Sequence, residues 1–257
     1  MLQLEMIDSL KSAALETEAV AAVFMYGSFT QNEADKYSDI EFYIFTNSDL
    51  DKRTWINDIS PLQLFFTNEQ GTEVAIFQNM VRGEFHFLPI EEVSLLKSWE
   101  GQITFSDIEN MILVDKEGLL KETLESIEKL RPNRDTEANR NLVAHQLINN
   151  LLMTKNFLYR GESARAHHQM HAVQECFLKM IRLVEKSHRE HWETPSRKLE
   201  QDIDREWYNR YLECTASLEE DSLIKGYRMC LKLATDLCYG LNIHNDALDV
   251  LDQIKAN

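Results

Sequence analysis

The sequence predicts an α+β protein with two domains: an N-terminal mixed β-sheet flanked by helices, followed by an all-α helical bundle. Three observations indicate this. Short β-like runs alternate with helical runs over the first half, and the second half has apolar residues only at helical spacing. The segment Arg131-Pro132-Asn133-Arg134 interrupts the pattern between them. We therefore expect the domains to span residues 1–131 and 132–257.

The N-terminal strands are predicted from short apolar runs or apolar–polar alternation. We expect strands at residues 21–26, 37–45, 62–66, 73–77 and 82–88. The turn Asn68-Glu69-Gln70-Gly71 predicts a hairpin between the third and fourth strands. Helical spacing predicts helices at residues 5–18, 48–58, 90–98 and 115–130.

The C-terminal half is predicted to be helical throughout, with breaks near Gly161 and Pro195. We expect helices at residues 135–160, 163–188, 199–212, 218–241 and 245–254. All four cysteines lie in this half and none forms a C-x-x-C pair. We therefore expect buried free thiols and a cytoplasmic protein. The sequence has no apolar run of 18 residues and no basic start followed by an apolar stretch, so we expect neither a membrane span nor a signal peptide.

Charge limits the class of partner. The chain has 43 acidic and 27 basic residues, giving a net charge of −16. Broad phosphate neutralisation is therefore not expected, so nucleic acid is not a predicted partner. The charge would attract metal ions and amine-bearing small molecules, although solubility alone is the simpler explanation.

The chemically informative segment lies between the first two strands. One strand ends in Gly27-Ser28, and the next opens with Asp39-Ile40-Glu41. Side chains at i and i+2 of a strand share a face, so Asp39 and Glu41 should project together. Neighbouring carboxylates repel unless a cation lies between them, and paired hard oxygens suit Mg²⁺. Gly27 permits close backbone approach, and amides at an expected helix start, with the Ser28 hydroxyl, can hold phosphate.

Each motif alone is weak, because Asp-x-Glu is commonly the hydrated face of a sheet and Gly-Ser is commonly a turn. In this order and spacing, they predict a site for nucleotidyl transfer. A third carboxylate comes from the strand Arg82 to Leu88, where Glu84 and His86 share a face. Glu84 is the favoured general base or third metal ligand, with Glu73 as the competing candidate.

These residues carry a resemblance to a known family. Gly-Ser followed by Asp-x-Glu resembles the polymerase-β-type nucleotidyltransferase superfamily, and the chain is more narrowly similar to lincosamide nucleotidyltransferases of the B type. The stretches that carry the likeness are Met25–Thr30, Tyr37–Phe45, Gly71–Val74, Arg82–Leu88 and Arg131–Arg134. The resemblance implies Mg²⁺, and transfer of a nucleoside monophosphate from ATP (or GTP) to a hydroxyl on the antibiotic's sugar, with release of pyrophosphate. It also implies a homodimer.

The resemblance also suggests residue roles. Asp39 and Glu41 would bind metal, and Glu84 would be the base. The remaining expectations are Gly27, Ser28 and Thr30 for the nucleotide, and Tyr43, Arg82 and His86 for the substrate. This chain has Gln31 and Asn32 where relatives carry Lys and Gly, so another cation would be needed. The candidates are Lys36, Arg82, Arg131 and Arg134.

Two further patterns suggest other chemistry. His167 and His171 share a helix face, but without an H-E-x-x-H pattern a solvated or substrate-lining face is favoured over a metal site. Arg182 and His188 match the short R-x5-H signature of HEPN-type ribonucleases, for which an exposed helix end is the favoured explanation. Two alternative functions stay open: nucleotidyl transfer to another acceptor such as an aminoglycoside, and a non-catalytic nucleotide-binding or toxin–antitoxin protein.

Overall fold

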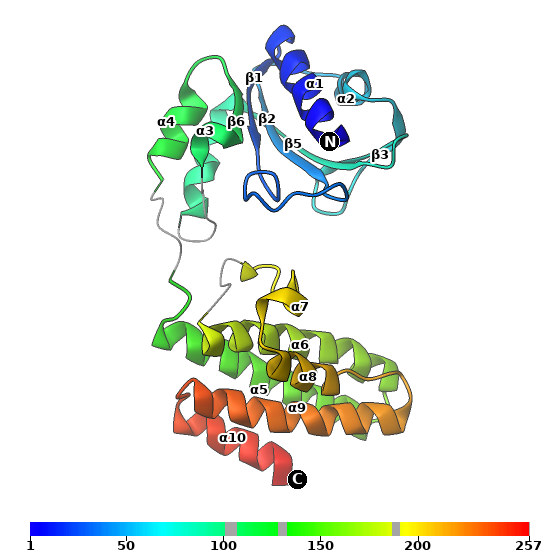
Figure 1. The fold of residues 1–257 in the computed structure, drawn as a ribbon, viewed down its shortest axis with the longest axis vertical. Coiled ribbons are helices and arrows are strands. Elements are labelled where there is room, and N and C mark those ends of the chain that lie inside the picture. Colours follow the sequence, from blue (N-terminus) through cyan, green and yellow to red (C-terminus); the bar gives the residue numbers. More distant parts are fainter. Residues whose placement is uncertain (101–106, 128–132, 187–190, 257) are drawn as a thin grey trace. The chain divides into compact units, whose positions relative to one another are not determined.

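The computed structural model describes residues 1–100, 107–127, 133–186 and 191–256. The chain divides into two compact units, residues 1–132 and 133–257. The first holds a mixed β-sheet with helices and the second holds long helices (Figure 1). The predicted α+β class is therefore confirmed.

The N-terminal unit is built on a six-stranded sheet with the order β3-β4-β5-β2-β1-β6. Its strands are β1 (Val20–Met25), β2 (Ile40–Thr46), β3 (Leu62–Thr67), β4 (Glu73–Phe77), β5 (Arg82–Pro89) and β6 (Ile112–Asp115). The β2–β5 pair is parallel, and the other pairs are antiparallel. The expected hairpin is confirmed, since β3 and β4 pair around the turn at residues 68–71.

Helices cover both faces of this sheet (Figure 1). On one face lie α1 (Leu2–Glu16) and α2 (Lys52–Ile59), packed on alternate residues of the strands. On the other lie η1 (Ile90–Trp99), α3 (Ile108–Met111) and α4 (Leu119–Glu125). The central strand β1 is buried along its whole length because both of its faces are covered.

Three local predictions differ from the structure. No helix follows Gly27-Ser28, because residues between β1 and β2 form turns and extended chain. The strand β6 was missed, since a four-residue run following a short helix carries little signal without its partner β1. The expected helix 199–212 is two helices, because Asp204 caps a new helix by accepting the amide of Glu206.

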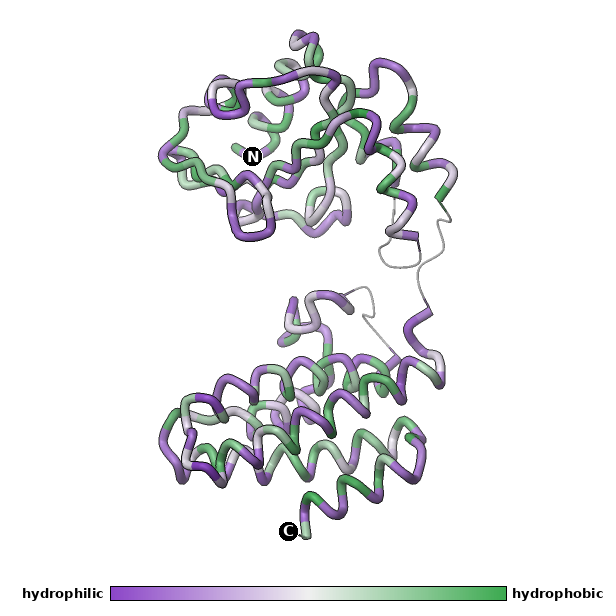
Figure 2. The backbone as a smooth tube through the Cα atoms, turned by 180° about the vertical axis from the view of Figure 1, so that it is seen from behind, coloured by the Kyte–Doolittle hydropathy of each residue, from purple (hydrophilic) through white to green (hydrophobic). Residues whose placement is uncertain are grey.

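The C-terminal unit has no strand in its described residues. Its helices are α5 (Glu137–Tyr159), α6 (Ser163–Glu185), α7 (Leu199–Asp202), α8 (Arg205–Glu213), α9 (Glu220–Gly240) and α10 (Asn245–Ala256). Apolar residues recur along the long helices (Figure 2) and meet in one core cluster. That core contains all four cysteines as buried free thiols, which confirms the prediction. Across the described part of the chain, no helix is long and apolar enough to cross a membrane.

Arg182 corrects the expectation of an exposed helix end. Its side chain is fully buried, ion-paired to Asp202 at 3.0 Å, and donates to the carbonyls of Pro195 and Arg197. The same carboxylate lies 2.8 Å from Nδ1 of His191. This network ties the segment around Pro195 to α6. The other half of the R-x5-H pattern, His188, lies outside the described residues.

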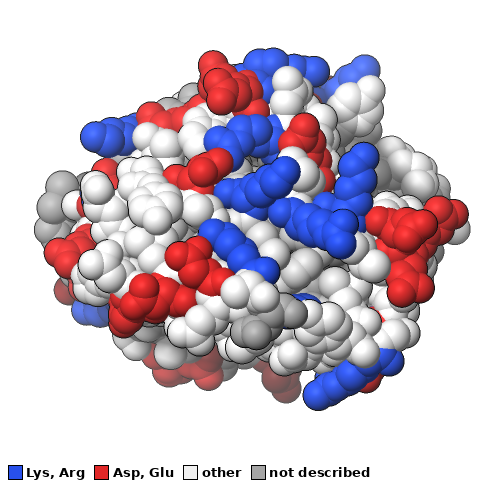
Figure 3. Space-filling model, turned by 90° about the horizontal axis from the view of Figure 1, so that it is seen from below, with Lys and Arg blue, Asp and Glu red and all other residues white. Residues whose placement is uncertain are grey.

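The net negative charge is not spread evenly. Figure 3 shows a face on which Lys and Arg side chains gather, with Asp and Glu mostly around them. On α9, the exposed cations Lys225, Arg228 and Lys232 recur at helical spacing. The net charge of −16 is therefore a property of the whole molecule, and one of its faces is locally rich in cations.

Candidate active site

The strands β2 and β5 bring the predicted carboxylates together. Because this pair is parallel and in register, Glu41 lies beside Glu84, and Tyr43 lies beside His86. Register partners share a face of the sheet, so all four side chains project to the same side. The neighbouring residues Ile40 and Phe42 are fully buried on the opposite face. Asp39 directly precedes β2, at the same end of the sheet.

The turn after β1 lies against Glu41. Gly27 has φ +80°, and a Cβ added there would lie 1.6 Å from Oε2 of Glu41. Only glycine therefore permits this approach of backbone and carboxylate. Ser28 follows in the same turn, and the Thr30 hydroxyl donates to the Gly27 carbonyl at 2.9 Å. Thr30 is buried, so its side chain maintains the shape of the turn.

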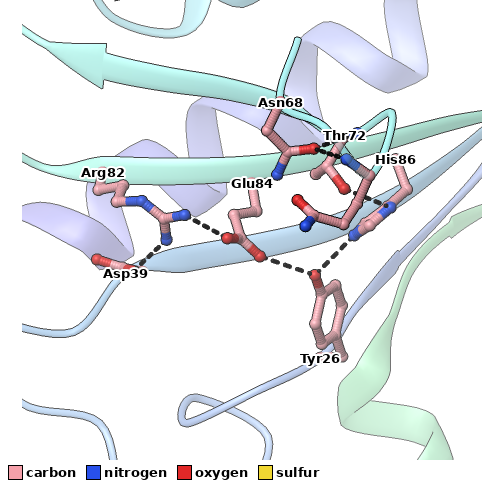
Figure 4. A network of polar contacts seen from close by, with 8 residues as sticks. Tyr26, Asp39, Asn68, Thr72, Arg82, Glu84 and His86 are labelled. Carbon is pink, nitrogen blue, oxygen red and sulfur yellow. Dashed lines mark hydrogen bonds and ion pairs between the residues drawn. The ribbon is translucent and has the colours of Figure 1, made fainter. Parts of the chain in front are cut away.

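Arg82 joins two of the acidic residues. Its guanidinium donates to Asp39 at 2.6 Å and to Glu84 by a short contact (Figure 4). Partial burial lowers the pKa of Arg82, but the hydrogen bonds to Glu84 and Asp39 outweigh this and raise the pKa above its ordinary value. The described residues contain no group of three or more side chains already arranged as metal ligands. Arg82 ion-pairs with both Asp39 and Glu84.

Aromatic side chains border the carboxylates. Tyr43 stacks on His86 with ring centroids 4.2 Å apart, and the edge of Trp99 meets Tyr43 at 5.0 Å. The Tyr26 hydroxyl lies 3.0 Å from Nε2 of His86 and donates to Glu84 at 3.5 Å (Figure 4). Burial, with the charges of Glu41 and Glu84, raises the pKa of Tyr26. The Tyr26 hydroxyl therefore stays protonated and available as a donor.

His86 is the titratable ring of this cluster. Burial lowers the pKa of His86, although the charge of Glu84 acts in the opposite direction. At neutral pH the ring is therefore neutral, with one N–H and one acceptor nitrogen. Its Nδ1 lies 3.5 Å from the hydroxyl of Thr72, which is itself buried. No role was predicted for Thr72 from the sequence, although Thr72 lies in the stretch Gly71–Val74 that carries the family likeness.

Glu73 does not compete with Glu84 for this position. It pairs with Phe85 across the β4–β5 ladder, so it faces the opposite side of the sheet from Glu84. There it accepts from Lys52 at 2.9 Å and from Thr67 at 2.7 Å. Burial raises the pKa of Glu73, but these hydrogen bonds outweigh burial and leave it below the ordinary value. Glu73 is a structural carboxylate.

Other predicted residues lie elsewhere. Lys36 lies over the ring of the exposed Tyr37, and Arg134 pairs with Glu193 inside the C-terminal unit. Arg131 falls outside the described residues, so Arg82 is the candidate cation that contacts predicted site residues. The rings of His167 and His171 meet edge to face on α6 at 5.3 Å.

The structure thus places a Gly-Ser turn against Glu41, and Glu41 beside Glu84 on one face of a mixed sheet, with Asp39 directly before β2. Residues 136–256 match the family described as lincosamide nucleotidyltransferase-like, C-terminal domain. The helical unit is therefore similar to the C-terminal domain of that family over just under half of the chain, which supports the nucleotidyltransferase resemblance of the sequence. No curated protein matches the sequence significantly.

Two solved structures align with most of the chain. An aminoglycoside 6-adenyltransferase from Bacillus subtilis is 12% identical with a TM-score of 0.41, covering 98% of this chain and 99% of its own. A nucleotidyltransferase-like protein from Exiguobacterium sibiricum 255-15 is 14% identical with a TM-score of 0.41, covering 94% of this chain and 77% of its own.

Proposed function

We propose that this protein transfers a nucleoside monophosphate, AMP from ATP in the first instance, to a hydroxyl of a lincosamide antibiotic and releases pyrophosphate. The product would no longer act as the antibiotic, so the activity would confer resistance. One observation carries the proposal: Glu41 lies against Gly27 and beside Glu84, with Asp39 linked to Glu84 through Arg82. The family match of the C-terminal domain supports the choice of acceptor.

The residues present fit Mg²⁺. Asp39 and Glu41 offer carboxylate oxygens, the ligands that Mg²⁺ takes together with substrate phosphates. When bound, Mg²⁺ would offset the negative charge of the triphosphate. Gly27 and Ser28 would contact the phosphates through backbone and hydroxyl groups, and Arg82 would supply the cation that the Gln31 position lacks.

Glu84 would act as the general base. It would take the proton of the acceptor hydroxyl while that oxygen attacks the α-phosphorus, and the bond from the α-phosphorus to the pyrophosphate oxygen would break. The half-buried rings of Tyr43 and His86 project to the same side of the sheet as this carboxylate, where the acceptor sugar would rest. The buried free thiols support a reducing, cytoplasmic setting for the reaction.

The test is mass spectrometry of clindamycin, lincomycin and kanamycin after incubation with the protein, MgCl₂ and either ATP or GTP. We expect clindamycin and lincomycin to gain one adenylate and pyrophosphate to appear, and EDTA to stop both. Modification of kanamycin alone would replace the lincosamide by an aminoglycoside acceptor. No product with any acceptor, together with a melting temperature raised by ATP and Mg²⁺, would identify a non-catalytic nucleotide-binding protein.

Two variants test the residue roles. Glu84→Gln should bind nucleotide but lose about 10²–10⁴-fold in kcat, the usual contribution of a general base. Asp39→Asn should abolish the Mg²⁺-dependent turnover. Glu69→Gln is the matched control, because Glu69 is an exposed carboxylate in the turn between β3 and β4. Turnover of Glu84→Gln within tenfold of Glu69→Gln would remove Glu84 from the mechanism.

We also propose that the protein is a homodimer. Light scattering during size-exclusion chromatography should then give twice the mass of the 30.1 kDa chain. A mass equal to one chain at micromolar concentration would contradict the dimer and leave the transfer reaction unaffected.

A further inference from the structure

A chain of polar side chains runs from the β3–β4 turn to Glu84. It begins at Asn68, whose side chain accepts the amide of Thr72 at 2.9 Å. The Thr72 hydroxyl lies 3.5 Å from Nδ1 of His86, and Nε2 of His86 lies 3.0 Å from the Tyr26 hydroxyl. That hydroxyl lies 3.5 Å from Oε2 of Glu84 (Figure 4).

The chemistry of the end group sets the direction of these hydrogen bonds. An ionised carboxylate only accepts, so the single hydroxyl proton of Tyr26 points to Glu84. The Tyr26 oxygen must then accept from Nε2–H of His86. A neutral imidazole has one N–H, so Nδ1 is left as an acceptor for the Thr72 hydroxyl. From the Thr72 hydroxyl onward, each proton in the chain therefore points toward the carboxylate.

The same geometry holds Glu84 from both sides. Arg82 contacts Oε1 and Tyr26 contacts Oε2, so each carboxylate oxygen has its own donor. His86 is held in turn by the parallel ring of Tyr43, at an interplanar angle of 8°. Two of the distances are at the long end for hydrogen bonds, and such contacts commonly shorten when substrate binds.

We propose that Thr72, His86 and Tyr26 are positioning residues that fix the orientation of the Glu84 carboxylate through this directed hydrogen-bond chain. The proposal rests on the role of Glu84 as general base put forward above. Thr72 sets the tautomer of His86, His86 orients the Tyr26 hydroxyl, and Tyr26 makes the hydrogen bond to Glu84. The β3–β4 hairpin thereby contributes to the site although its own carboxylate, Glu73, faces away from it.

The first readout does not depend on activity. Nitrogen NMR of histidine-labelled protein at pH 8 distinguishes a protonated ring nitrogen from an acceptor nitrogen, and His86→Gln assigns the signal. We expect His86 to be neutral with the proton on Nε2. Thr72→Val and Tyr26→Phe should each convert this single tautomer into a mixture, whereas Tyr239→Phe, which alters an exposed tyrosine of α9, should not.

The second readout is steady-state kinetics. Tyr26→Phe removes a hydrogen bond to a charged group, so kcat should fall roughly 10- to 100-fold while KM for the triphosphate stays within about twofold. The fall in kcat should be smaller for Thr72→Val. Thr72→Ser should have the kcat of the wild type, because it keeps the hydroxyl. The double variant should lose no more than Tyr26→Phe alone, since both act through one chain.

The outcomes separate the two proposals. A proton on Nδ1 of His86, or additive losses in the double variant, would overturn the hydrogen-bond chain even in an active enzyme. Absence of product from the wild type with every acceptor would overturn the transfer reaction, and with it the role of Glu84. In that case the nitrogen signals would still decide whether Thr72, His86 and Tyr26 are linked as described.

Discussion

Replacing Gly27 by alanine tests the close approach of the turn to Glu41. The added Cβ would lie 1.6 Å from Oε2 and 2.7 Å from Cδ of Glu41. A normal carbon–oxygen contact needs roughly 3.2–3.5 Å, so carboxylate and turn must separate by about 1.5 Å or more. Alanine at φ +80° also costs about 1–2 kcal/mol of backbone energy. Both effects act at the turn that would hold the phosphates.

Gly118→Ala is the matched control. Gly118 has φ +78°, and an added Cβ would meet nothing within 4 Å. It therefore carries the same backbone cost without the collision, and its free energy of unfolding should fall by about 1–2 kcal/mol. The free energy of unfolding of Gly27→Ala should fall at least as much. This variant should also lose about 100-fold in turnover, the loss typical of a 1 Å displacement in an active site.

The assay is urea unfolding together with pyrophosphate release, with both variants measured beside the wild type. Gly118→Ala should retain the turnover of the wild type. If Gly27→Ala matched Gly118→Ala in turnover to within about threefold, the position of Glu41 against the turn would have no part in the reaction. The proposed role of the Gly27-Ser28 turn in holding the phosphates would then be wrong.

Three further predictions concern buried groups. Arg182→Met should lower the free energy of unfolding by about 3–5 kcal/mol, because it removes the buried ion pair to Asp202 and the hydrogen bonds to the carbonyls of Pro195 and Arg197; a loss under 1 kcal/mol would contradict this. The Lys52 hydrogen bond helps to hold the pKa of Glu73 low, so ionised Glu73 stabilises the folded state. This contribution to the free energy of unfolding is complete above about pH 4.5 and is lost as the pH falls. The difference in free energy of unfolding between wild type and Glu73→Gln should therefore shrink as the pH falls from 6 to 3. A constant difference would argue against stabilisation by ionised Glu73. Burial raises the pKa of Cys238 to about 11, so this thiol should react with a disulfide reagent at pH 8 only after unfolding, and prompt labelling would disprove burial.

Much of the site could be predicted from local pattern. The alternation of β2 and β5 puts Glu41 with Tyr43, and Glu84 with His86, on single faces whatever the rest of the fold does. The Gly27-Ser28 turn was likewise visible as the end of an apolar run. The helix expected after it was wrong, because the turn is followed by further turns and extended chain rather than by repeated helical hydrogen bonds.

Local sequence patterns could not predict the order of the strands in the sheet. From the sequence, Glu84 was only preferred over Glu73 as the general base, because both carboxylates lie on alternating strands near the same hairpin. The antiparallel β4–β5 register turns Glu73 to the opposite face, where Lys52 balances its charge. The strand β6 was missed for a related reason, because its partner in the sheet is the distant β1.

The sequence by itself determined the two-part α/β and helical organisation, the turn at Gly27, and the face on which each strand residue lies. These are local properties, set by side-chain alternation and helical spacing within a few residues. Only the tertiary structure decided that Glu41 lies beside Glu84, that Arg82 bridges Asp39 and Glu84, and that Tyr26, His86 and Thr72 meet. Those contacts join residues up to 60 positions apart, and they exist because β2 and β5 pair in parallel in one particular register.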